Sequence, residues 1–208
     1  MLPFCDAPML QRIVDDLAEQ GWSQQNVFLS QALTAALAQE CRRRAQAGEL
    51  APAAVGRGLR QEVREGIRGD LTQWIDPGQA GCCDEYLALM DSLRGALNRG
   101  LYAGLEGFEC HFALYPPGAF YKRHLDRFHD DDRRVVSTVL YLNEAWQPGD
   151  GGELRMFLGD PAQVHDVHPV GGCLVVFMAG EVPHEVLPAR RERLSLTGWF
   201  RRRGSELF

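Results

Sequence analysis

The spacing of apolar residues changes near Gly107, and this change limits the folds that a chain of 208 residues can adopt. Before Gly107 the apolar side chains recur with the 3.6-residue period of helices, and after it they alternate with the period of two that strands have. A chain of this length can bury one substantial core. We therefore predict a single α+β domain over residues 1–208, mainly β, with helices at its N-terminal end.

About three helices are expected in the first hundred residues, as support for the β core. Apolar stripes of helical spacing cover residues 10–17, 29–37 and 86–97, and Gly21 and Gly100 are expected to end the first and third helices. Between the second and third stripes, residues 47–66 are rich in glycine, small and charged residues. This composition predicts a mobile loop.

The second half of the chain is expected to form the β core over residues 107–200. In the first strand, Phe108, Cys110, Phe112 and Leu114 alternate with Glu109, His111, Ala113 and Tyr115, so the two sets face opposite sides. Further strands are expected at residues 121–126, 134–142, 153–158, 173–178, 184–187 and 193–200. Many short strands separated by glycine and proline turns are typical of a sandwich, a jelly roll or a barrel.

Charge and composition exclude several classes of protein. A formal net charge of -6 argues against nucleic acid as the main partner, and the short basic run 201–203 is expected to be a solvated end. No basic leader precedes an apolar stretch, and no apolar run is long enough to span a membrane. Six cysteines without a Cys-x-x-Cys pair indicate reduced thiols. We predict a cytoplasmic protein that binds neither membranes nor nucleic acid.

A candidate metal site is suggested by two of the six histidines in the sequence together with one aspartate. In a strand, His124 and Asp126 project from the same face, and His184 can add a second nitrogen. Two histidines and one carboxylate leave adjacent coordination positions open, which suits iron(II) that must hold a bidentate co-substrate and dioxygen. Zinc accepts the same ligands, so the residues alone leave the metal open.

Arg193 follows His184 by nine positions in a strand-like stretch, and its guanidinium suits the far carboxylate of a dicarboxylate co-substrate. Thr197 and Tyr141 could add hydroxyl donors. By pattern alone, a surface salt bridge is the default interpretation of Arg193, and Tyr141 and Trp199 are more often core residues than site residues. The remaining histidines, His111, His129, His165 and His168, have no arginine at a matching distance or lie in an acidic turn.

Taken in order, these residues resemble the signature of 2-oxoglutarate oxygenases with a double-stranded β-helix, or jelly roll. The resemblance is closest to the prolyl 4-hydroxylases, particularly the oxygen-sensing group and its bacterial relatives. The similar segments are IRGDLTQWID at 67–76, YPPGAFYKRHLD at 115–126, VLYLNEAW at 139–146, GGELRMF at 151–157 and PHEVLPARRERLSLTGWF at 183–200. Residues 1–60 resemble no family that we can name, and the turn at 116–118 is shorter than in the animal oxygen sensors.

The resemblance implies a role for each matching residue. His124, Asp126 and His184 would bind the iron, and the co-substrate pocket would be formed by Arg193, Tyr141, Tyr115 and Thr197. Contacts to the substrate would come from Trp199, Tyr121 and Arg134. The connection before Ile67 would be a loop that closes over a bound peptide, anchored by Arg68 and Asp70.

The resemblance also implies the reaction. Iron(II), 2-oxoglutarate and O2, with ascorbate as a supporting reductant, would hydroxylate the 4-position of a prolyl residue in a protein and release succinate and CO2. Elongation factor Tu is the substrate expected by resemblance. We expect the enzyme to be a monomer and, like the oxygen-sensing relatives, to respond to oxygen. Two alternatives stay open: an oxygenase of a free amino acid or small metabolite, and a non-catalytic β-sandwich binding module whose histidines are structural.

Overall fold

The computed structural model describes residues 7–55, 62–63, 66–127, 132–159 and 163–203. Within these ranges three helices are present: α1 (Ala7–Gln20), α2 (Gln31–Gln46) and α3 (Gly81–Leu101). The strands that precede the β core are β1 (Trp22–Gln25), β2 (Ala51–Pro52), β3 (Ala54–Val55), β4 (Glu62–Val63) and β5 (Leu71–Trp74). The core strands are β6 (Leu105–Tyr115), β7 (Tyr121–His124), β8 (Arg134–Tyr141), β9 (Leu154–Leu158), β10 (Gln163–Val167), β11 (Leu174–Met178), β12 (His184–Val186) and β13 (Arg193–Arg202).

The helices form where the apolar stripes predict them. In α1 the buried residues are Ile13, Val14 and Leu17, and the chain leaves the helix through Gly21 with a φ of 79°. Gly100 does not end α3 as expected, because the helix continues to Leu101. A Cβ at Gly100 would collide with Val14, so this glycine lets α1 and α3 pack closely instead.

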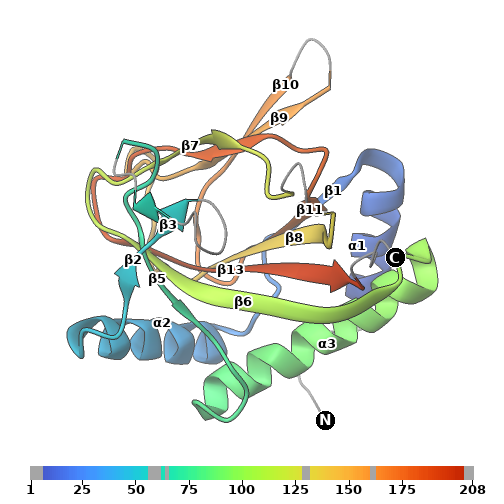
Figure 1. Ribbon diagram of the computed structural model, residues 1–208, viewed down its shortest axis with the longest axis horizontal. Helices are drawn as coiled ribbons and strands as arrows, with labels where there is room; N and C mark the ends of the chain where they lie inside the picture. Colours follow the sequence, from blue (N-terminus) through green and yellow to red (C-terminus); the bar gives the residue numbers. More distant parts are fainter. Residues whose placement is uncertain (1–6, 56–61, 64–65, 128–131, 160–162, 204–208) are drawn as a thin grey trace.

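Two antiparallel sheets build the β core. The major sheet has the order β1-β11-β8-β13-β6-β5-β2, and the minor sheet has the order β10-β9-β12-β7. The helices lie along one side of the major sheet, and the minor sheet lies on the other side (Figure 1). The arrangement is a jelly-roll core supported by three helices, as the sequence predicts.

The alternation in β6 separates the two faces of the major sheet. Cys110, Phe112 and Leu114 pack in the cluster that includes the helices, while Ala113 and Tyr115 pack in a second cluster between the sheets. The neighbouring strand follows the same rule, because Arg193 pairs with Tyr115 across β13 and β6. Every second residue of these strands therefore faces the space between the sheets.

Strands β1, β5 and β10 are not predicted by the sequence pattern. The segments WSQQ and LTQW are short and largely polar, and they pair only with β11 and with β6 and β2. Within the expected loop at 47–66, Leu50 and Ala53 are buried and β2 pairs with β5, so this part of the segment packs on the body of the domain. Residues 56–61 and 64–65 lie outside the described residues, as does His129.

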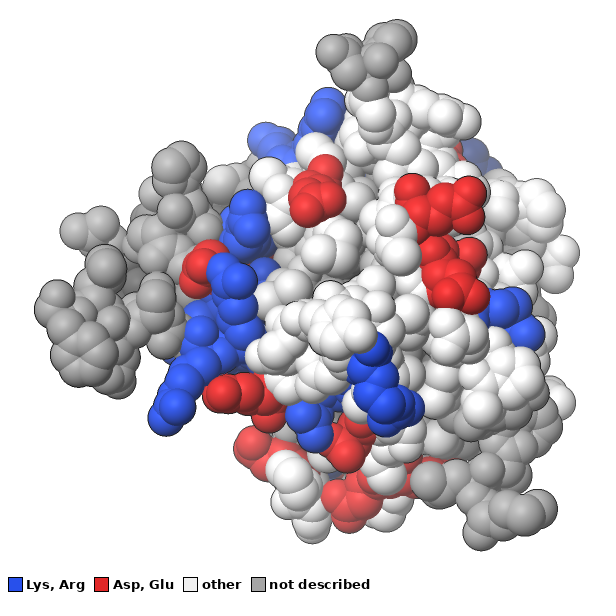
Figure 2. Space-filling view, turned by 90° about the vertical axis from the view of Figure 1, so that its right-hand side faces the viewer, with Lys and Arg blue, Asp and Glu red and all other residues white. Residues whose placement is uncertain are grey.

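The helices, the cysteines and the charged side chains at the surface bear on the classes of protein that the composition argues against. None of the helices within the described ranges is long and apolar enough to cross a membrane. The five described cysteines are free thiols. Figure 2 views the side where β13 ends and shows a band of basic side chains with acidic ones beside it. In the basic run, Arg201 bonds to Glu109 at 2.6 Å and Arg202 pairs with Asp132.

Candidate metal and co-substrate site

The minor sheet brings His124, Asp126 and His184 together. His124 at the end of β7 lies directly opposite His184 of β12, and Asp126 follows two residues after β7. One ligand atom from each residue lies within 4.8 Å of the other two. Within the described residues this is the one such group of histidine, cysteine and acidic side chains that could hold a metal ion. Asp126 is reached after the strand ends, so the chain turn, not strand alternation alone, sets its direction.

Hydrogen bonds to the backbone orient both imidazoles. His124 Nδ1 lies 2.8 Å from the Lys122 carbonyl, and His184 Nδ1 lies 3.0 Å from the Val182 carbonyl. Because a carbonyl oxygen only accepts, each Nδ1 carries the hydrogen and each Nε2 keeps its lone pair. The Nε2 atoms lie 3.5 and 3.7 Å from the Asp126 carboxylate. In metal sites, a hydrogen bond from the ring nitrogen that does not bind the metal, here Nδ1, fixes the orientation of each histidine.

The electrostatics favour an ionised Asp126 and a neutral His184. Burial opposes the charge of Asp126, but His184, His124 and a hydrogen bond of 2.7 Å from Ser137 outweigh it and hold the pKa of that carboxyl well below its usual range. Burial lowers the pKa of His184. Two imidazole nitrogens and one carboxylate oxygen are the donor set that open iron(II) sites use, so the residues present fit this ion.

Arg193 is buried without an acidic partner among the described residues. Its side chain is 1% exposed, Nε donates to the Gly152 carbonyl at 2.8 Å, and Nη1 donates to Ser195 Oγ at 3.3 Å. Nη2 and the Tyr141 hydroxyl have no hydrogen-bond partner within the described part of the chain. A buried cation is costly unless it is paired. The two unpaired donors therefore fit a carboxylate that a small molecule supplies.

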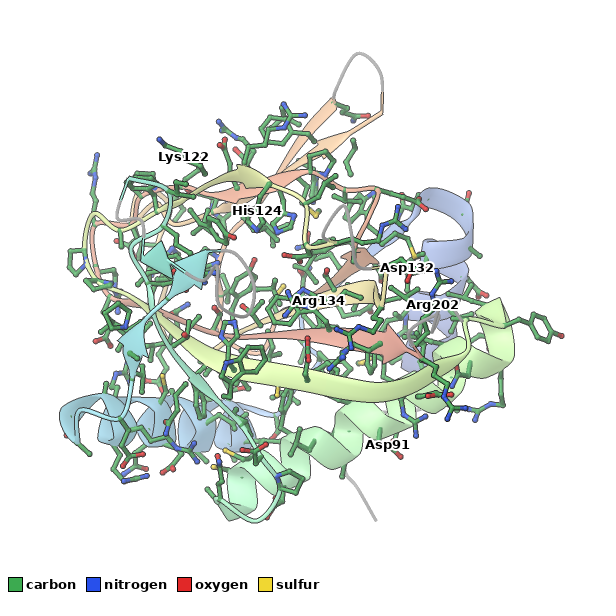
Figure 3. The ribbon with its side chains drawn as sticks, viewed as in Figure 1. Asp91, Lys122, His124, Asp132, Arg134 and Arg202 are labelled. Atoms are coloured by element: carbon green, nitrogen blue, oxygen red, sulfur yellow. The ribbon has the colours of Figure 1, made fainter. Side chains whose placement is uncertain are left out.

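A cavity of about 340 Å³ joins these groups. Ten of the twelve residues expected at the site line it: His124, Asp126, His184, Arg193, Tyr115, Thr197, Trp199, Tyr121, Arg134 and Arg68. Tyr141 and Asp70 lie behind the lining, where each contacts an arginine that does line it. In Figure 3 His124 and Arg134 are seen on the two opposing sheets.

A stacked column connects residues 67–70 to the metal ligands. The Arg68 guanidinium lies 4.3 Å from the ring centre of Tyr121, which stacks on His124 at 3.6 Å. Asp70, which is buried, fixes Arg68 with hydrogen bonds of 2.7 and 2.6 Å. Burial works against the charge of Arg68, but the bond to Asp70 raises its pKa. The segment before β5 is thus tied to the strand that carries His124.

Arg134 and Trp199 form another wall of the cavity. The guanidinium carbon of Arg134 lies 3.6 Å from the ring centre of Trp199. Glu109 accepts from Arg134 Nε at 2.9 Å and from Arg201 Nη1 at 2.6 Å, so it holds two basic side chains beside the indole.

Several lining residues were not expected. Trp74 and His111 are paired across β5 and β6 and both face the cavity, as do Thr72 and Val139. Ser137, which bonds to Asp126, was also missed. The odd-numbered positions of β6 gave a usable signal, since Tyr115 and His111 share one face of that strand. Trp74 lies in the segment 67–76 that carries the family resemblance, but its position on the cavity was not expected because β5 itself was not predicted.

Known proteins similar to this chain agree with the geometry. Residues 110–201 match the 2OG-Fe(II) oxygenase superfamily, whose description gives the iron(II) and 2-oxoglutarate that the sequence predicts as cofactors. Human Egl nine homolog 1 is 34% identical over 143 residues, which cover 64% of this chain and 33% of the relative. The chain thus spans about a third of that relative's length.

Solved structures extend the similarity over nearly the whole chain. A Pseudomonas putida prolyl-4-hydroxylase is 70% identical with a TM-score of 0.87, covering 94% of this chain and 100% of that one. A prolyl hydroxylase from Trichoplax adhaerens, solved with a peptide fragment of the hypoxia inducible factor oxygen degradation domain, is 29% identical with a TM-score of 0.84. It covers 93% of this chain and 89% of its own. The chain therefore belongs to the prolyl 4-hydroxylases of the 2OG-Fe(II) oxygenase superfamily.

Proposed function

We propose that this chain hydroxylates a prolyl residue of a protein substrate at the 4-position, using iron(II), 2-oxoglutarate and O2. The observation that carries the proposal is that one cavity contains both a candidate set of metal ligands and the buried Arg193, which has no acidic partner among the described residues. Elongation factor Tu is the candidate substrate. We further propose that the enzyme is cytoplasmic and monomeric, that ascorbate supports its turnover, and that its activity follows oxygen supply.

In this proposal the side chains of the cavity bind and orient, and none of them acts as a nucleophile. His124, Asp126 and His184 hold the iron through Nε2 and carboxylate atoms, and Arg193 with Tyr141 binds the far carboxylate of 2-oxoglutarate. When bound, the iron and co-substrate supply the oxidising chemistry that replaces a C–H hydrogen by hydroxyl. Tyr115 and Thr197 line the same pocket and exclude water.

The substrate would enter beside the wall of the cavity that Arg134 and Trp199 form. Trp199, Tyr121 and Arg134 line the cavity with two aromatic rings and a cation, which suits a proline ring and its flanking chain. Arg68 and Asp70 would anchor the segment that closes over the peptide. The runner-up is an oxygenase of a free amino acid or small metabolite, for which the same pocket would hold the co-substrate but not an extended chain.

Iron(II)-dependent conversion of 2-oxoglutarate to succinate is the first test. We expect turnover by the wild type and its loss in Asp126→Ala, because one of three ligands is removed. The matched control is Asp132→Ala, which removes an acid that pairs with Arg202 at the surface. If Asp126→Ala keeps wild-type turnover, the ligand assignment is wrong.

Mass spectrometry separates the two candidate functions. A set of peptides that covers every proline of elongation factor Tu is incubated with the enzyme, each beside a copy with alanine in place of proline. One added oxygen on a proline, absent from the alanine copy, is the expected result. Oxygen added to free amino acids or to another residue type, with none on any proline, would favour the runner-up.

A further inference from the structure

A row of side chains crosses three strands of the major sheet on its cavity side. Trp74 of β5 is opposite His111 of β6, and His111 is opposite Thr197 of β13. Trp199 lies two positions further along β13, on the same face, with its ring centre 5.5 Å from that of His111. All four residues line the cavity that contains the metal ligands.

His111 offers this cavity an unpaired acceptor. Its side chain is 5% exposed, and Nδ1 lies 3.0 Å from the Phe112 carbonyl, which can only accept, so Nδ1 carries the hydrogen. In the neutral ring Nε2 is then a bare acceptor, and no described residue donates to it. Burial lowers the pKa of His111 to about 4, so the ring is neutral near pH 7.

Trp199 offers an unpaired donor next to it. Its side chain is 6% exposed, and Nε1 has no hydrogen-bond partner among the described residues. The ring is held by Arg134 on its face, while Trp74, which is half exposed, lies 6.1 Å away. An indole N–H that is buried without a partner is unfavourable, because it has lost its hydrogen bond to water. A hydrogen-bond acceptor that enters the cavity would remove this cost.

We propose that His111 and Trp199 together bind the backbone of one substrate residue in an extended conformation. Its N–H would donate to His111 Nε2, and its carbonyl would accept from Trp199 Nε1. In an extended chain the N–H and C=O of one residue point to the same side, as in an antiparallel ladder, so two neighbouring groups on one wall can bind both. This inference rests on the proposed function, because the cavity must receive a peptide.

The same pair predicts which residue is bound. Proline has no backbone N–H, so it cannot satisfy His111. The bound residue is therefore a neighbour of the target proline in the substrate chain. A side-chain carboxamide of asparagine or glutamine carries the same donor and acceptor on one group, and the test below distinguishes this source from the backbone.

The test measures peptide binding without turnover. Fluorescein-labelled dodecapeptides around each proline of elongation factor Tu are titrated into the protein with manganese(II) and N-oxalylglycine, and binding is followed by anisotropy. For the tightest peptide, each residue next to the proline is N-methylated in turn. We expect one N-methyl group to weaken binding to the wild type by about tenfold, the size of one hydrogen bond of about 1.4 kcal/mol.

His111→Leu should remove this sensitivity. The variant lacks the Nε2 acceptor, so N-methylation should not weaken peptide binding any further. His165→Leu, which removes a histidine on β10 that bonds to Gln24, is the matched control and should keep the tenfold effect. A second variant, Trp199→Phe, keeps an aromatic ring but lacks the N–H. Binding to the wild type should be sensitive to replacing the same peptide residue's carbonyl by a thiocarbonyl. Binding to Trp199→Phe should not show this sensitivity.

The outcomes separate this inference from the proposed function. Equal N-methyl penalties in the wild type and His111→Leu overturn the inference, even if the same peptide gains an oxygen on proline. If replacing an asparagine or glutamine of the peptide by alanine is the change that His111→Leu masks, the backbone assignment is overturned. If no prolyl peptide binds or gains oxygen, the proposed function fails, and this inference fails with it.

Discussion

His124 and His184 lie directly opposite each other on the paired strands β7 and β12, with ring centres 4.3 Å apart. Strand pairing therefore brings together two candidate metal ligands that are sixty residues apart in the sequence. Asp126 completes the set from the turn after β7, where Ser137 of the opposite sheet holds its carboxylate. The two sheets thus share the construction of one site.

Ser137→Ala should weaken metal binding while leaving the fold intact. Ser137 is fully buried and donates to Asp126 Oδ2 at 2.7 Å, so its loss frees the carboxylate to rotate. Loss of such a partner typically costs about 10–100-fold in metal affinity. Calorimetric titration with manganese(II) measures the change.

Thr138→Val is the matched control for Ser137→Ala. Thr138 is the next residue of β8 and is equally buried, but its hydroxyl donates to the Gly198 carbonyl at 3.3 Å. Its substitution should leave manganese affinity near the wild-type value. Equal affinities for Ser137→Ala and the wild type would show that Ser137 does not position the ligand.

Arg193→Ala should weaken 2-oxoglutarate binding by about 1.5–3 kcal/mol, the range for a hydrogen bond to a charged group. Tyr141→Phe should cause a smaller loss, because it removes one neutral donor that has no other described partner. Metal affinity should persist in both variants, since neither residue belongs to the ligand set. Tryptophan fluorescence titration with 2-oxoglutarate in the presence of manganese(II) measures both affinities.

Two controls accompany these substitutions. Arg190→Ala removes an exposed arginine of the same charged run, and Tyr86→Phe removes another buried hydroxyl without a described partner, in the core beside the helices. Both should retain wild-type affinity for 2-oxoglutarate. If Arg193→Ala does the same, the arginine does not bind the co-substrate.

The stability of the metal-free protein should fall as the pH drops from about 6.5 to about 4. The pKa of His111 is lowered by burial from 6.5 to about 4, so in this interval the unfolded chain binds a proton that the folded chain does not. The free energy of unfolding therefore decreases with falling pH, by about 3 kcal/mol for this one group. Urea denaturation at a series of pH values in the presence of EDTA measures the slope.

His111→Leu should flatten this slope in part, because the pKa of the buried His184 is also lowered. The control is His168→Leu, which removes an exposed histidine and should keep the wild-type pH dependence. An unchanged slope in His111→Leu would mean that folding does not lower the pKa of His111.

The sequence by itself determined the three helices, most of the core strands and the order of the candidate ligands along the chain. Apolar spacing predicted the three helices and most core strands, since burial of one face imposes a period on the chain. His124 with Asp126, and His184 with Arg193, could be recognised because their chemistry is carried by residue type and the spacing within each pair is short. Gly100 does not end its helix, and only the packed structure shows that this glycine makes room for Val14.

Tertiary structure alone decided which distant residues meet. The pairing of Trp74 with His111, the bond from Ser137 to Asp126, and the lack of a described acid beside Arg193 depend on strand register and sheet packing. A shift of one residue in register would turn each of these side chains to the other face of its strand. Local sequence carries no record of that register, because it is set by contacts between segments far apart in the chain.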